Sequence, residues 1–96
     1  MTQGHDLLRA AIREGGQSNV RLLKPELFTS DELPAFNFFN RYYLSHAGEL
    51  PPLEAFLREG IALDEPIQIP GQETSFLYKY ELVVRRQKSK LFERLL

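Results

Sequence analysis

The last part of the chain, residues 74–96, contains no glycine and no proline, and this uninterrupted stretch constrains the fold more than any other feature. The spacing of its apolar residues predicts a helix throughout, which would extend roughly 33 Å at about 1.5 Å per residue. With 96 residues in total, the chain is long enough for one domain with one small core. We therefore expect the distal part of this helix to need a partner chain.

The apolar residues of this stretch nearly follow a heptad pattern, in which Lys88 occupies the position between Val84 and Leu91. Leaving large apolar side chains in water would forgo about 1.5–3 kcal/mol for each of them. A second copy of the chain is the obvious partner. The residues predicted at this oligomer or partner interface are Leu77, Tyr80, Val84, Leu91, Phe92 and Leu95.

Glycine and proline divide the rest of the chain into short segments with helical apolar spacing. Thr29 and Glu32 form a T-x-x-E capping box at the start of the segment at 31–46. We predict helices or helical turns at 5–14, 19–24, 25–28, 31–46 and 53–59. We predict a loop at 64–72. The expected fold is all-α: a compact bundle of four or five short helices over residues 1–73, then one long C-terminal helix at 74–96, the first arm of a helical hairpin.

Five aromatic residues fall within eight positions of the predicted helix at 31–46, too many to face one core. Phe36, Phe39 and Tyr43 share one face, whereas Phe38 and Tyr42, four residues apart, project from another. Two interpretations stay open. The helix lies between two layers of the fold, or Phe38 and Tyr42 form part of a contact patch for another protein.

Charge is distributed unevenly along the chain, although the net charge is only −1. Residues 1–24 carry a net +2, residues 25–73 carry nine acids and two bases, and residues 74–96 carry a net +4. We favour solvated helix faces whose opposite charges help the segments to pack. The sharper alternative is a basic, DNA-proximal site on the C-terminal helix, with weak or indirect nucleic-acid contact, formed by Arg85, Arg86, Lys88 and Lys90.

No pattern in the sequence predicts a catalytic, cofactor-binding or metal site. The chain has no cysteine and no Gly-Lys phosphate-binding motif, and His5 and His46 lie far apart. The sequence contains two acidic pairs, Asp31-Glu32 and Asp64-Glu65. Helix capping explains the first pair and a polar loop the second, so a hydrolytic enzyme built on these carboxylates is disfavoured. The chain also lacks a membrane-spanning apolar run and the apolar stretch of a signal peptide, which predicts a cytoplasmic protein with no membrane partner.

The order of short motifs along the chain resembles the N-terminal domain of DnaB-type replicative helicases. The motifs are Leu7-Leu8-x(3)-Ile12, Lys24-Pro25-Glu26-Leu27-Phe28, the aromatic helix at 31–45, and the step Gly48-Glu49-Leu50-Pro51 into the next helix. The resemblance implies a non-catalytic domain in the collar of a ring-shaped hexamer, which pairs head to head and through its hairpins. It also implies a homo-oligomer, as a dimer or a ring built of dimers, and docking of primase or another replication protein.

The chain departs from this family in two respects. It has no ATPase domain, and the expected hairpin stops after its first helix, which ends at Leu96. We therefore expect either that the chain continues in a longer parent helicase or that its last helix finishes against a partner chain. The C-terminal helicase-binding domain of DnaG-type primases is similar too and stays an alternative, as does a small nucleic-acid-binding protein that uses the basic C-terminal helix.

Overall fold

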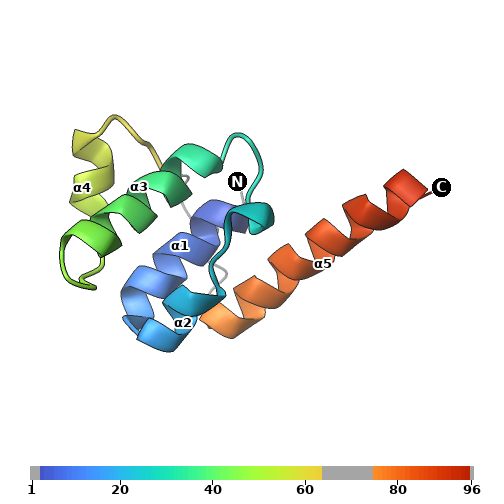
Figure 1. Ribbon diagram of the computed structural model, residues 1–96, viewed down its shortest axis with the longest axis horizontal. Coiled ribbons are helices and arrows are strands. Elements are labelled where there is room, and N and C mark those ends of the chain that lie inside the picture. The colour runs from blue at the N-terminus through green and yellow to red at the C-terminus, as the bar shows by residue number, and fades with distance from the viewer. Residues whose placement is uncertain (1–2, 64–74, 96) are drawn as a thin grey trace, which may run out of the picture.

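The structure is a computed structural model that describes residues 3–63 and 75–95, with 89–95 as backbone only. Every regular element in these ranges is helical, which confirms the all-α prediction (Figure 1). The predicted loop at 64–72 lies outside the described residues. The elements are α1 (Gln3–Glu14), α2 (Gln17–Leu22), the 3-10 turn η1 (Pro25–Leu27), α3 (Leu33–Ser45), α4 (Leu53–Arg58) and α5 (Phe76–Leu95).

Helices α1, α3 and α4 end shortly before a glycine, and α2 ends shortly before Pro25. At the end of α3, Ala47 (φ 56°) and Gly48 (φ 86°) are both left-handed, and the N–H of Gly48 donates to the carbonyl oxygen of Tyr43 at 3.0 Å. Glycine adopts this conformation without the steric cost that a side chain brings, so it ends the helix cleanly. The predicted helix at 19–24 is wrong at both ends, since α2 begins at Gln17 and ends at Leu22. It ends there because Leu23 (ψ 119°) and Lys24 (ψ 149°), the residue before Pro25, are both extended.

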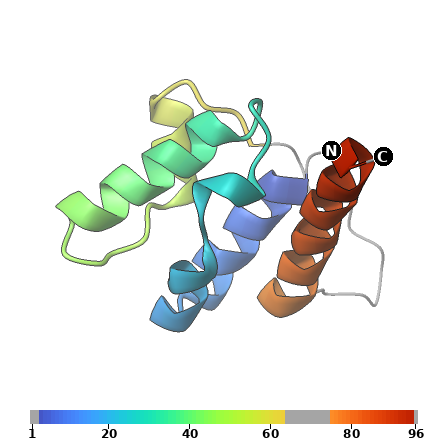
Figure 2. The same ribbon diagram turned by 45° about the vertical axis from the view of Figure 1, so that its right-hand side comes forward.

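Helix α1 forms the centre of the molecule and packs against both α3 and α5 (Figure 2). Its side chains at Leu7, Leu8, Ala10 and Ala11 are fully buried. Aromatic rings from the other helices complete the core around them. The most completely buried of these rings are Phe39 of α3, Phe56 of α4 and Phe76 of α5.

Helix α5 contributes to this core with its first half. Phe76 and Val83, seven residues apart, are fully buried, and Tyr80 packs between them as a partly buried ring. Residues 3–63 and the first half of α5 therefore share one core. Beyond that half, the last turns of α5 extend past the other helices (Figure 1).

Candidate functional site: the anchored C-terminal helix

Glu32 has the most buried charged side chain among the described residues, with 1% of its surface exposed. It lies in the turn before α3, where its Oε1 accepts a hydrogen bond from the N–H of Thr29 at 3.0 Å. This bond is one half of the capping box that the sequence predicts. The other oxygen, Oε2, accepts from the N–H of Gly4 in α1 at 3.0 Å, so Glu32 also ties this turn to the central helix.

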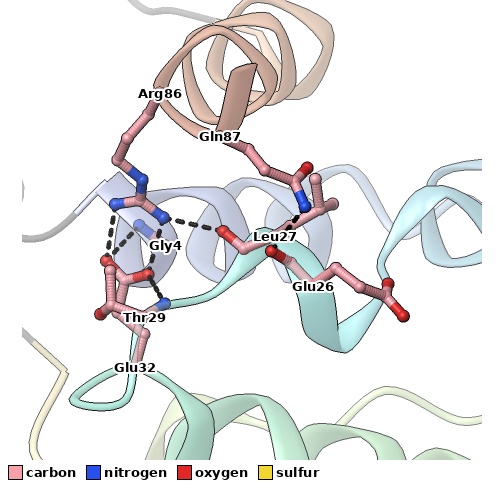
Figure 3. A network of polar contacts seen from close by, with 7 residues as sticks. All are labelled: Gly4, Glu26, Leu27, Thr29, Glu32, Arg86 and Gln87. Atoms are coloured by element: carbon pink, nitrogen blue, oxygen red, sulfur yellow. Dashed lines mark hydrogen bonds and ion pairs between the residues drawn. The ribbon is translucent and has the colours of Figure 1, made fainter. Parts of the chain in front are cut away.

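Arg86 of α5 completes the site by forming a bidentate ion pair with Glu32 (Figure 3). Its Nη1 donates to Oε2 of Glu32 at 3.0 Å, and its Nη2 donates to Oε1 at 2.9 Å. The same Nη2 also donates to the carbonyl oxygen of Leu27 at 2.8 Å. We call Gly4, Thr29, Glu32 and Arg86 the Glu32 clamp, because together they join α1, the turn before α3, and α5.

The clamp keeps Glu32 ionised. Burial alone would raise the pKa of this carboxyl group, but the hydrogen bonds from Arg86, Thr29 and Gly4, together with the charge of Arg86, lower it further than burial raises it. Its pKa therefore lies below the ordinary value of a glutamic acid. Each carboxylate oxygen already accepts two hydrogen bonds, which leaves little capacity for proton transfer to a substrate.

Two further contacts hold the first half of α5 against α1. The N–H of Phe76, in the first turn of α5, donates to Oε2 of Glu14 at 2.6 Å. Nζ of Lys79 lies 3.8 Å from Oδ2 of Asp6, and both side chains are largely buried. A carboxylate near a helix N-terminus also suits the helix dipole. These contacts support the interpretation in which opposite charges help the segments to pack.

The basic run predicted as a DNA-proximal site does not form a single surface. Arg86 points inward to the clamp, where its guanidinium is ion-paired with Glu32 and its side chain is only 21% exposed. Arg85 and Lys88 are exposed, whereas the side chain of Lys90 lies outside the described residues. Because Arg86 binds Glu32, placing it beside a nucleic-acid phosphate would require breaking the clamp.

The predicted apolar stripe of α5 is offset from the face that actually meets the core. The buried face contains Phe76 and Val83, one residue before the predicted Leu77 and Val84. Leu77 is 58% exposed, and Val84 is partly buried at the edge of the core. Tyr80 is partly buried as well, with its ring parallel to that of Phe76 at 6.1 Å between centroids. The other predicted interface side chains lie outside the described residues: Leu91, Phe92 and Leu95.

The structure corrects the expected surface role of Phe38. Its ring is 8% exposed and meets Phe56 of α4 edge-on, with 4.9 Å between centroids. Tyr42 is partly buried and stacks on His46 at 3.7 Å, with the two rings nearly parallel. Helix α3 therefore lies between α1 and α4, so the layered interpretation accounts for Phe38.

The acidic residues considered for catalysis do not converge. Asp31 is exposed, Glu32 is committed to the clamp, and Asp64 and Glu65 lie outside the described residues. Within the described ranges, no group of three or more acidic, histidine or cysteine side chains could hold a metal ion. Across the same ranges, no helix is both long enough and apolar enough to cross a membrane.

Sequence analysis missed the burial of Glu32 and its pairing with Arg86. Fifty-four residues separate the two, and neither residue type is usually buried. The capping box was the one available signal, because it turns the Glu32 side chain back toward the N–H of Thr29.

Comparison with known proteins gives no relative from which a role could be transferred. No family model, curated protein or solved structure matches this chain. A function must therefore be inferred from the arrangement of the helices, in which one side of α5 is anchored and a different side is open to solvent.

Proposed function

We propose that this chain is a non-catalytic assembly domain that self-associates through the outer side of α5. The observation that carries this proposal is Leu77, a large apolar side chain that is 58% exposed on a helix whose first half is anchored to the core. Val84 follows seven residues later and is only partly buried. Because seven residues make nearly two helical turns, Leu77 and Val84 lie on the same side of α5.

The anchoring contacts determine which side of α5 is presented. Three side chains of α5 face the other helices. Lys79 forms an ion pair with Asp6, Val83 packs in the core, and Arg86 belongs to the clamp. These contacts oppose rotation of α5 about its own axis, so the Leu77 side stays open to solvent. The sequence continues the same spacing at Leu91, seven residues after Val84. A twofold pair of α5 helices would bury this stripe on both copies.

The size of α5 supports the same role. Twenty residues of helix extend about 30 Å. The last turns extend past the rest of the molecule (Figure 1), where a second copy has access to them. The sequence places Leu91, Phe92 and Leu95 in these turns, and burial of a large apolar side chain contributes about 1.5–3 kcal/mol.

The biological setting that we propose is DNA replication in the cytoplasm, with the chain as the N-terminal domain of a DnaB-type helicase. In this setting α5 is the first arm of a helical hairpin, the domain forms a dimer or a ring of dimers, and it docks primase or another replication protein. This assignment rests on the order of motifs along the sequence. Direct DNA binding is a weaker candidate, because the clamp uses the guanidinium of Arg86.

Light scattering on two matched variants tests self-association through α5. Leu77→Asp places a charge on the proposed interface, and Leu44→Asp places the same charge on α3, at a leucine that is 72% exposed. We expect the unmodified chain and Leu44→Asp to form dimers or larger species and Leu77→Asp to be monomeric. Loss of self-association in both variants, or in neither, would reject α5 as the interface.

A further inference from the structure

We propose that the groove between α3 and α4 binds an extended acidic peptide segment of a partner protein. Residues 25–73 contain nine acids and only two bases, Arg41 and Arg58. The structure brings both of these bases to the wall of one hollow, about 350 Å³ in volume. A stretch of chain that is otherwise acidic thus presents its two guanidinium groups at a single place.

The groove is long enough for a short peptide. A second hollow of about 620 Å³ shares Arg41 and Glu59 with the first and continues along α3 past Asn40 and Asn37 to Pro34. From Pro34 to Ser45 the helix advances about 16 Å, the length of about five residues of extended chain. The exposed amide groups of Asn37 and Asn40 can donate to and accept from a peptide backbone.

The two guanidinium groups of the groove favour carboxylates, whereas Glu59 on the same wall opposes them. Arg41 is exposed and forms no ion pair within the described part of the chain, so its donors are open to a ligand. Arg58 makes only a solvent-exposed contact with Glu54, at 3.8 Å, which an incoming carboxylate can replace at little cost. Guanidinium groups bind carboxylates through two parallel hydrogen bonds, which fixes the orientation of the ligand as well as its charge.

The aromatic side chains of the groove disfavour a nucleobase. His46 covers one face of the Tyr42 ring at 3.7 Å, and Phe38 packs against the same ring at 6.1 Å. Single-stranded nucleic acid usually binds by stacking its bases on open aromatic faces, and His46 already occupies one face of the Tyr42 ring.

Peptide binding in this groove does not depend on self-association through α5. Helices α3 and α4 lie on the opposite side of α1 from α5 (Figure 1), so the two surfaces can be tested separately. Glu59 lies in both hollows and opposes a carboxylate ligand. It therefore gives a substitution that should strengthen binding.

Fluorescence anisotropy with the labelled pentapeptide DEFDE, and with its uncharged counterpart NQFNQ, tests the proposal on the full chain. We expect DEFDE to bind and NQFNQ to bind at least about fivefold more weakly, in line with the loss of one or two exposed ion pairs. Arg41→Glu should weaken DEFDE binding by about fivefold or more, and Glu59→Gln should strengthen it about twofold. Arg21→Glu, on the exposed surface of α2, makes the same charge change outside the groove and should leave binding unchanged.

Three results would overturn this assignment. One is equal binding of the two peptides, or no binding of DEFDE at millimolar protein. Another is an equal effect of Arg41→Glu and Arg21→Glu, which would indicate general charge attraction. The last is tighter binding of a labelled thymidine oligonucleotide than of DEFDE, with the same sensitivity to Arg41→Glu. Circular dichroism of each variant checks that the helices are retained.

Discussion

Replacing Glu32 with glutamine removes the negative charge of the clamp while keeping the size of the side chain. The carboxylate accepts four hydrogen bonds, two at each oxygen, from Gly4, Thr29 and Arg86. A glutamine has one oxygen and one NH2 group, and the NH2 group cannot accept. Whichever way the amide is turned, two of the N–H groups that donate to Glu32 would then face the NH2 group of the glutamine, which is itself a donor.

The expected cost follows from the burial of the pair. Glu32 is 1% exposed and the Arg86 side chain 21%, so the substitution leaves a largely buried guanidinium without its counter-ion. Removing one partner of a buried, hydrogen-bonded ion pair costs about 3–5 kcal/mol. For a domain whose total stability is about 5–15 kcal/mol, this is a large share. The midpoint of thermal unfolding should fall by more than about 10 °C at neutral pH.

The same residue predicts an acid dependence with a definite sign. The pKa of Glu32 is lower in the folded protein than its ordinary value of 4.5. A group of this kind stabilises the fold fully above the unfolded-state pKa, and the stabilisation is lost as the pH falls through the lowered folded-state pKa. The stability difference between the unmodified chain and Glu32→Gln should therefore be largest near neutral pH and shrink below pH 4.5.

Urea unfolding followed by circular dichroism, at neutral and at acid pH, measures both effects. Asp31→Asn is the matched control, because it removes a neighbouring but exposed carboxylate. We expect the control to change the free energy of unfolding by less than about 0.5 kcal/mol. If Glu32→Gln is as stable as this control at neutral pH, or if its deficit does not shrink in acid, the account of the clamp is refuted.

Three other substitutions test neighbouring parts of the structure, each by urea unfolding. Gly4→Ala should lower the free energy of unfolding by about 2 kcal/mol, because the added Cβ would collide with the Glu32 carboxylate. This loss is expected despite a gain in helix propensity of about 1 kcal/mol. An unchanged or raised stability would show that the carboxylate can move aside. Arg86→Lys keeps the charge but loses the paired geometry and the bond to Leu27, so a loss of about 1–2 kcal/mol is expected, and no loss would mean that charge alone suffices. Phe38→Ala should cost about 3–5 kcal/mol, whereas Leu44→Ala, at an exposed site, should cost less than about 0.5 kcal/mol; equal costs would contradict the layered packing of α3.

Local features of the sequence predicted the helices well. Gly15, Gly48 and Gly60 each follow a helix with a positive φ, and Pro25 closes the segment after α2. These signals act within one or two turns of backbone, so they can be recognised without knowing the fold.

Features that depend on distant segments were not predictable in the same way. The spacing of Phe38 and Tyr42 placed them on one face of α3, but nothing local showed that Phe56 of α4 would cover Phe38. In α5, Phe76 and Val83 have the same seven-residue spacing as Leu77 and Val84. A difference of one residue turns a helix by about 100°, so only the packing against α1 decides between the two pairs.

The clamp connects the stability of the domain to its proposed role. Arg86 holds one side of α5 against Glu32, and Leu77 lies on a side that these contacts leave exposed. Weakening the clamp should therefore weaken self-association as well, because α5 would no longer present one fixed side. Asp31→Asn should leave self-association unchanged, since it does not touch the clamp.

Sedimentation equilibrium of the unmodified chain tests the central claim most directly. The monomer has a mass of 11.1 kDa. From micromolar to millimolar concentration at neutral pH, we predict that the weight-average mass rises to at least that of a dimer, and that Leu77→Asp stays at the monomer mass over the same range. A mass of 11.1 kDa for the unmodified chain at every concentration would contradict assembly through α5.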